Sequence, residues 1–310
     1  AHRELFNKKS RENRTGKELS RVLHLASPPD VVWQDPAIPG LDAFTVSAQE
    51  NPAGTDRHLL QLVFPPRHFQ KLEHEAFLFR YIPRKRLLAP EVVTLFFAGP
   101  FQCQIYDQGP GCVVAPREWP EVESDATKHI WSCRPPVDFV RIYSASTPLM
   151  HERLHDDFFS RLEIAVDTRE EMHLLFSFRQ ALPDIRHTLQ SLPLYVHNPD
   201  LNRFNVLRND NEQLLVLAWC RWSLEPLGAG TPVSLRKGGM ADFLEELRVD
   251  RKDITDEISV DALRLADWCF QLESLIKKRR YKAALQVMDR ILQSNWQPFE
   301  GALIDDELDD

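Results

Sequence analysis

The chain has 310 residues, of which 43% are hydrophobic and 27% are charged. This balance predicts a sizeable packed core and excludes global disorder. The formal net charge of −8 argues against general nucleic-acid binding, which needs a basic footprint. No stretch approaches the roughly 20 unbroken apolar residues that a membrane helix requires, so we expect no membrane span.

The cysteines and the chain ends indicate a cytoplasmic protein. Five scattered cysteines form no CxxC pair, and the first residues are polar and basic with no apolar run behind them. Such cysteines are typical of reduced thiols, and the start does not have the pattern of a signal peptide. The chain begins with Ala1, so earlier removal of an export signal stays open. We interpret the acidic end, residues 305–310, as a solvated tail.

The first third of the chain is predicted to form a small sheet that carries one helix. Residues 1–40 are expected to be an N-terminal arm, polar at first and then interrupted by prolines. Beyond residue 40, β-branched and apolar runs predict four strands, and apolar residues at helical spacing predict a helix between the second and third. The expected strands are 44–48, 58–64, 91–97 and 102–106, and the expected helix is 68–81.

The remainder is predicted to be mostly helical. A Gly/Pro-rich joint at 108–111 precedes helical patterns at 150–166 and 168–192. Two apolar stripes, within 265–276 and 284–292, predict the closing helices. The chain is therefore expected to have a sheet lobe at 41–111 and a helical lobe with an acidic tail at 112–310.

The strand-loop-strand pattern over residues 194–219 contains the most specific chemistry. Asp200 and Asn205 lie in a polar loop between apolar runs, and Ala218 ends the strand that follows. Phosphotransferases place a catalytic aspartate and a metal-binding asparagine in this way, and they keep a second aspartate at the end of the next strand.

This pattern resembles the aminoglycoside phosphotransferase and choline kinase group of the protein-kinase-like superfamily, whose catalytic loop is H-G-D-x-x-x-x-N followed by a strand ending I-D-W. The resemblance is best over 190–230 and weaker over 43–111. It implies an α+β, two-lobed protein-kinase-like fold, with a small antiparallel-sheet N-lobe carrying one helix and a larger, mainly helical C-lobe. It also implies that Asp200 is the catalytic base and that Asn205 binds magnesium.

Several positions depart from the family pattern. Ala218 replaces the second aspartate and offers magnesium no oxygen. By the resemblance, Gln61 replaces the phosphate-binding lysine and brings no charge, while Glu75, with Glu73 as second choice, is the glutamate that would steady that lysine. The site is therefore predicted to be degenerate, with Asp200 as a vestigial base and Asn205 as a weak metal ligand.

A second motif, His151-Glu152-Arg153-Leu154-His155, matches HExxH. On one helix this spacing places two imidazoles on one face, with the glutamate as base for a zinc-bound water. Arg153 inside the motif and the acids that follow argue against a buried zinc helix. We interpret the segment as an exposed, charged helix face.

These observations favour a kinase-like pseudoenzyme that acts as a binding or regulatory protein, without ordinary Mg-ATP phosphotransfer and without a cofactor. We expect a protein partner or a small-molecule ligand in the cleft between the lobes. The alternative is an active small-molecule or glycan phosphotransferase with atypical metal use, which would need ATP and magnesium. A zinc metallopeptidase using His151, Glu152 and His155 is a distant third hypothesis.

Overall fold

The structure is a computed structural model in which the chain forms two compact units. The first unit comprises residues 1–126 and 200–221, and the second comprises residues 127–199 and 222–310. The segment with Asp200 and Asn205 therefore belongs to the unit that also contains the N-terminal sheet. The predicted lobe boundaries stay a prediction. The structure describes residues 17, 30–34, 42–49, 56–64, 69–98, 101–107, 111–209, 212–217 and 219–297.

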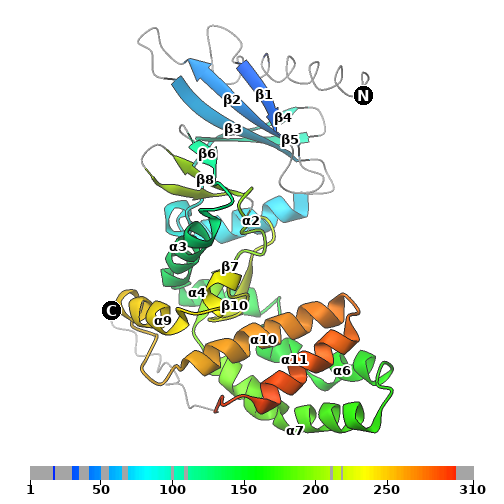
Figure 1. The fold of residues 1–310 in the computed structure, drawn as a ribbon. Coiled ribbons are helices and arrows are strands. Elements are labelled where there is room, and N and C mark those ends of the chain that lie inside the picture. Colours follow the sequence, from blue (N-terminus) through cyan, green and yellow to red (C-terminus); the bar gives the residue numbers. More distant parts are fainter. Residues whose placement is uncertain are drawn as a thin grey trace. The chain divides into compact units, whose positions relative to one another are not determined.

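The first unit contains a five-stranded antiparallel sheet in the order β1-β2-β3-β5-β4 (Figure 1). The four predicted strands correspond to β2 to β5. The strands are β1 Asp30–Gln34, β2 Asp42–Gln49, β3 Asp56–Phe64, β4 Val92–Ala98 and β5 Phe101–Asp107.

The strand β1 differs from the sequence expectation, because it lies in the segment predicted as an arm broken by prolines. Pro29 and Pro36 flank this strand without entering it. β1 is at the edge of the sheet and pairs with β2 alone. An edge strand tolerates nearby prolines because one side of it needs no ladder hydrogen bonds.

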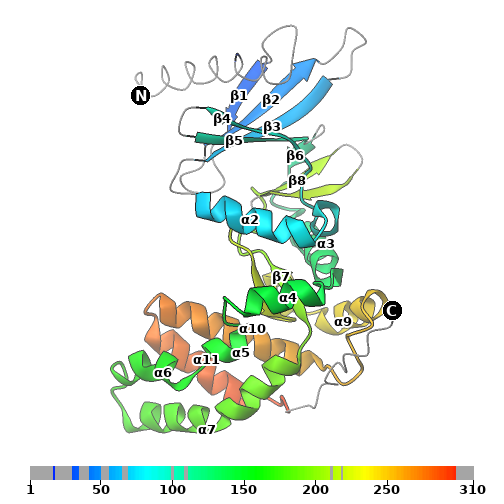
Figure 2. The ribbon, with the colours of Figure 1, turned by 180° about the vertical axis from the view of Figure 1, so that it is seen from behind.

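The helix α2, Phe69–Tyr81, confirms the single predicted helix of this region (Figure 2). Its buried face includes Leu72 and Leu78, followed by Ile82 after the helix end, which matches a helical period. A short 3-10 helix, η2 Arg84–Leu87, then turns the chain through a left-handed Leu88 with φ of 57°. The Leu88 carbonyl accepts a 2.7 Å hydrogen bond from Val216 N, which joins this turn to the segment that follows the Asp200 loop.

A three-stranded antiparallel sheet, in the order β6-β8-β9, completes the strands of the first unit. Val206 and Val216, paired across β8 and β9, are buried, as expected for apolar residues on one face of a small sheet. The Asp200 loop is therefore tied at its end to a packed strand pair. The strands are β6 Gly111–Val113, β8 Val206–Asn209 and β9 Leu214–Val216.

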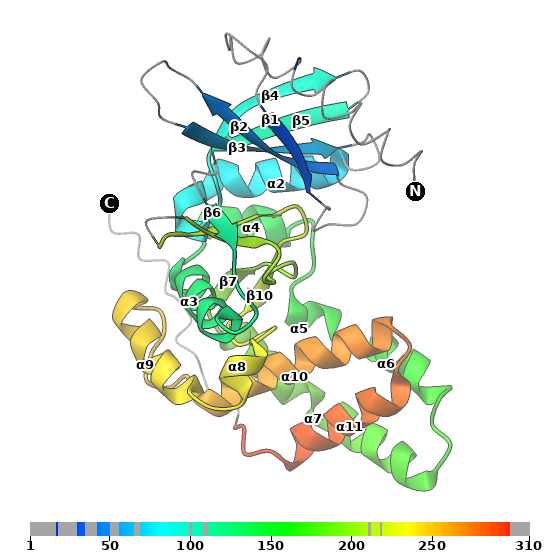
Figure 3. The same cartoon turned by 45° about the horizontal axis from the view of Figure 1, so that its top comes forward.

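The second unit is mainly helical, with one antiparallel pair formed by β7 Leu194–His197 and β10 Ser223–Pro226 (Figure 3). The long helix α7, Arg169–Ser191, packs against α11, Tyr281–Gln293, and α11 packs against α10, Val260–Lys277. The closing helices α10 and α11 and their buried stripes confirm the sequence prediction. The other described helices are α3 Trp119–Ser132, which crosses the unit boundary, α4 Val137–Ser144, α5 Met150–Arg153, α6 Asp156–Glu163, α8 Val233–Arg236 and α9 Met240–Asp250.

The helix expected over 150–166 is interrupted. α5 ends at Arg153, Leu154 leaves helical geometry with ψ of 72°, and His155 is the N-cap of α6. In contrast, α7 matches its predicted range and begins at a Thr168–Glu171 capping box. No helix in the described part of the chain is long and apolar enough to cross a bilayer.

Candidate functional site

The polar loop of the first unit is organised by its own side chains. Asn202 and Asn205 each donate a side-chain N–H to the Asp200 carbonyl at 2.8 Å. Asn202 Oδ1 in turn accepts a 3.0 Å hydrogen bond from the Phe204 amide. Asp200 and Asn205 are both buried. The predicted pair is thus brought together in one compact loop whose geometry is set by local hydrogen bonds.

The Asp200 carboxylate is engaged by Arg221. Arg221 Nε donates to Asp200 Oδ2 at 2.8 Å, and Arg221 Nη2 donates to Oδ1. The Asp200 side chain is 8% exposed and that of Arg221 is 51% exposed, so the guanidinium covers a buried acid from the solvent side. The hydrogen bonding to Asp200 raises the pKa of Arg221, so the guanidinium is held in its charged form. Sequence analysis missed Arg221, although its place two residues after Trp219 was visible.

Asn205 has a side-chain oxygen that no described residue satisfies. Its residue is 1% exposed, and its Oδ1 is a buried oxygen with no hydrogen-bond partner in the described structure. The Asn205 backbone carbonyl accepts from Leu217 N at 2.7 Å, so the residue lies beside the segment that follows β9. Buried unsatisfied oxygens are uncommon and indicate a missing donor or cation.

Ala218 lies outside the described residues, so its predicted position is not tested. Its neighbour Trp219 is buried and donates from Nε1 to the Val216 carbonyl at 3.0 Å. The Trp219 ring meets Phe79 of α2 edge to face, with centroids 6.3 Å apart. The strand β9 ends at Val216, and Trp219, three residues later, packs against the helix that contains Glu75.

Glu75 is 6% exposed and pairs with Arg84, at 3.4 Å between Oε1 and Nη2. The Arg84 guanidinium also lies 3.9 Å from the Phe79 ring centroid. Gln61, at the position assigned to the lysine, lies in β3, where it pairs with Phe44 and Ile105. An arginine from the turn after α2 therefore supplies positive charge to Glu75.

The charges of Glu75 and Asp200 both act on the thiol of Cys220. Burial, together with the charges of Glu75 and Asp200, raises the pKa of its thiol to about 11. At neutral pH Cys220 is therefore a protonated, unreactive thiol rather than a nucleophile.

The small-residue turn of the second unit, Leu227–Gly230, is set by close contacts. Gly228 and Gly230 have φ of +99° and +64°. A Cβ on Gly228 would approach the Leu263 carbonyl oxygen to 2.4 Å, and one on Gly230 would approach His197 Cε1 to 2.5 Å. The His197 ring is held by Tyr195, whose hydroxyl lies 2.8 Å from His197 Nδ1. The glycines are therefore required by space as well as by conformation.

The HExxH segment does not form a zinc helix. His151 belongs to α5, whereas His155 caps α6, so the two imidazoles are not presented by one continuous helix. The prediction of an exposed, charged face was wrong for Arg153, whose side chain is 19% exposed and pairs with Glu225 and Glu273. No cluster of three or more His, Cys, Asp or Glu in the described residues could hold a metal ion.

Comparison with known proteins identifies the fold. No family model matches the sequence, and no curated protein matches it. Among solved structures, the macrolide 2'-phosphotransferase MphH from Brachybacterium faecium matches with a TM-score of 0.51 and 10% identity, over 90% of this chain and 98% of that one. This chain has a kinase-like fold.

Two further matches have lower TM-scores. An aminoglycoside phosphotransferase from Alicyclobacillus acidocaldarius matches with a TM-score of 0.41 and 11% identity, over 84% of this chain and 88% of that one. The Plasmodium vivax ethanolamine kinase matches with a TM-score of 0.43 and 9% identity, over 86% and 78%. The MphH match confirms the predicted α+β, protein-kinase-like fold. At these identities the likeness concerns the fold alone.

Proposed function

We propose that this kinase-like chain is a pseudoenzyme that acts as a binding or regulatory protein without ordinary Mg-ATP phosphotransfer. The observation that carries the proposal is the Asp200–Arg221 pair. A catalytic base must accept the proton of an attacking hydroxyl through a carboxylate oxygen. Here each Asp200 oxygen already accepts a hydrogen bond from one guanidinium.

The other positions support the same proposal. Phosphoryl transfer depends on cations placed around the phosphates. Ala218 supplies no oxygen to magnesium, and Gln61 supplies no charge. Glu75, which would steady a lysine, instead pairs with Arg84. The donor set that remains, one amide oxygen and one acid neutralised by arginine, does not fit an ordinary octahedral magnesium site.

One observation favours the alternative of an active phosphotransferase with atypical metal use. The buried Oδ1 of Asn205 has no hydrogen-bond partner in the described structure, and a carbonyl-type oxygen is a good ligand for a hard cation. In this alternative the Asn205 oxygen would hold the cation, and Arg221 would have to leave Asp200 before a substrate hydroxyl could approach.

A nucleotide titration separates the two functions. The protein is heated with ATP alone, with magnesium alone and with both, and the unfolding temperature is followed. A ligand that binds only the native state, at a concentration 100 times its Kd, stabilises the folded protein by about 2.7 kcal/mol. Binding would therefore raise the unfolding temperature measurably. The pseudoenzyme proposal predicts no magnesium-dependent gain from ATP.

The matched variants are Asn205→Ala, which removes the orphan oxygen, and Asn202→Ala, which alters the same loop and leaves that oxygen in place. A magnesium-dependent stabilisation that is lost in Asn205→Ala and kept in Asn202→Ala would overturn the proposal in favour of the phosphotransferase.

A further inference from the structure

The second unit contains a cavity in which basic side chains gather. Its volume is about 420 Å³, and its lining residues come from the α5–α6 junction and from α7. Figure 2 shows these helices. Among the described residues that line it, none is acidic. Six of them can donate a hydrogen bond, namely His151, His155, Arg179, Arg186, His187 and Gln190.

The sequence explains why these groups converge. Four of the lining residues lie along one face of α7, because positions seven, eight and eleven after Arg179 return to the same side of a helix. These positions are Arg186, His187 and Gln190. The break at Leu154 then turns His155 into the N-cap of α6, and both histidines of the HExxH segment line this cavity. The HExxH segment does not form a zinc helix, but its two histidines line the same cavity.

Two contacts hold the arginines at the cavity. Arg186 Nε donates to the His151 carbonyl at 2.8 Å, which fixes its guanidinium beside α5. Arg179 pairs through Nη1 with Glu163, while its Nε is a buried donor with no hydrogen-bond partner in the described structure. An unsatisfied buried N–H on a cationic group is costly, and an anionic acceptor is the partner that satisfies it.

The charge at the cavity contrasts with the rest of the molecule. The chain as a whole has a net charge of −8, so gathered basic side chains do not follow from general basicity. Burial lowers the pKa of His151, and the charges of Arg186 and Arg153 act in the same direction, against Glu152. Arg179 is paired with Glu163, whereas no carboxylate among the described residues forms an ion pair with Arg186. Arg186 therefore gives the cavity a positive charge that no lining acid offsets.

We propose that this cavity is an anion site that takes a phosphate monoester. A phosphate offers three acceptor oxygens and nearly two negative charges, which match forked guanidiniums and imidazole N–H groups. The volume exceeds that of a phosphate group, so it also holds part of the molecule that bears the phosphate. The ligand chemistry is shared by phosphorylated small molecules and by phosphorylated side chains of a protein.

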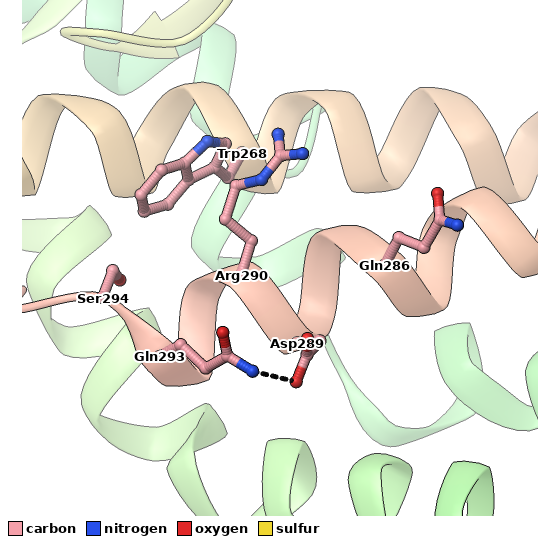
Figure 4. A pocket seen from close by; sticks show the side chains of 6 residues that line it. All are labelled: Trp268, Gln286, Asp289, Arg290, Gln293 and Ser294. Carbon is pink, nitrogen blue, oxygen red and sulfur yellow. Dashed lines mark hydrogen bonds between the residues drawn. The ribbon is translucent and has the colours of Figure 1, made fainter.

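A second cavity of the same unit provides the control. It lies between α10 and α11, has a volume of about 370 Å³ and is lined by Trp268 with polar residues of α11 (Figure 4). Asp289 there accepts a 2.8 Å hydrogen bond from Gln293, so this cavity, unlike the first, has an acid among its lining residues. Removal of Arg290 therefore deletes one positive charge from the unit without touching the α5–α7 cavity.

Isothermal titration of the full chain with inorganic phosphate tests the proposal. Saturable binding is expected, and Arg186→Gln should weaken it roughly tenfold or more, as for a lost charge-assisted hydrogen bond. His155→Gln, an exposed cap position, should weaken it by a smaller factor, while Arg290→Gln should leave it unchanged. Circular dichroism of each variant confirms that it is folded. Glucose 6-phosphate and a phosphoserine peptide, each beside its unphosphorylated form, then distinguish a small-molecule source from a protein source.

Three results would overturn the proposal. They are the absence of saturable phosphate binding below about 10 mM, equal weakening by Arg186→Gln and Arg290→Gln, and stoichiometric zinc that perturbs the His151 and His155 resonances in place of phosphate. Because these residues belong to the second unit, none of the three outcomes bears on the Asp200–Arg221 proposal.

Discussion

Removal of Arg153 should destabilise the second unit strongly, because it leaves a buried acid without its cation. Arg153 donates to Glu273 at 2.8 and 3.0 Å and to Glu225 at 2.8 and 3.1 Å. The Glu225 and Glu273 side chains are 4% and 5% exposed. Lys277 also pairs with Glu273, at 2.6 Å, whereas no other cation pairs with Glu225 in the described structure. Most of the loss in unfolding free energy should therefore come from the unpaired, buried charge of Glu225.

For Arg153→Met, which keeps the apolar stem, we expect a loss of about 3–5 kcal/mol in unfolding free energy at pH 7, the usual effect of breaking a buried ion pair from one side. With an m-value of about 3 kcal/mol/M, this loss lowers the urea midpoint by about 1–1.7 M. Arg141→Met is the matched control, because the Arg141–Asp138 pair is exposed. It should cost within about 0.5 kcal/mol.

The destabilisation should depend on pH. Burial raises the pKa of Glu225 in the folded protein, and Arg153 opposes that rise. Without Arg153 the folded pKa of Glu225 rises further above its unfolded value. Stability from such a group is present below the unfolded pKa and is lost as pH rises through the folded pKa. The difference in unfolding free energy between Arg153→Met and the parent protein should therefore be small near pH 4 and should reach the expected loss at pH 7.

A second substitution sharpens the test. Arg153→Met combined with Glu225→Leu removes the orphaned charge and should recover much of the loss, because an apolar pair can replace a buried ion pair. A loss below about 1 kcal/mol for Arg153→Met, or a loss equal at pH 4 and pH 7, would refute the argument that Glu225 depends on Arg153.

Three further changes test other parts of the structure. Gly230→Ala forces a Cβ toward His197 at a φ of +64°, so thermal unfolding should show a loss of about 1–3 kcal/mol; an unchanged midpoint would contradict the close contact. Thr168→Ala removes the N-cap that accepts from Glu171 N at 3.1 Å, and the urea midpoint should fall by an amount equivalent to about 1 kcal/mol, with Ser at the same position preserving it. Ala218→Asp with Gln61→Lys should raise magnesium and ATP affinity only modestly, because the surrounding residues are not arranged to position the new groups. Catalysis should not return, since misplacement by about 1 Å can cost roughly a hundredfold in rate. Calorimetry showing tight magnesium binding already in the parent protein would refute the view that Ala218 disabled the site.

The sequence by itself determined the elements that depend on local periodicity. Alternating and helical apolar patterns located β2 to β5, α2 and the closing helices, since these patterns are set by which face of each element is buried. It also located the Asp200–Asn205 loop, within which Asn202 and Asn205 donate to the Asp200 carbonyl at most five positions away. The kinase-like fold was implied by the resemblance of residues 190–230 to the aminoglycoside phosphotransferase and choline kinase group, and the order of the elements alone did not establish it.

Only the tertiary structure decided which charges meet. Arg221 reaches Asp200 across 21 positions, and Arg153 reaches Glu273 across 120. No short pattern in the sequence encodes such pairs, and a basic residue near a helix end is usually solvated. Arg153 was therefore predicted to be exposed, although its side chain is only 19% exposed. The same reason applies to His151 and His155. The sequence pattern places them on one helix, but the helix ends before Leu154 and the two histidines belong to different elements. Local residue preferences define the elements, but long-range packing determines which polar groups lose water and must find partners.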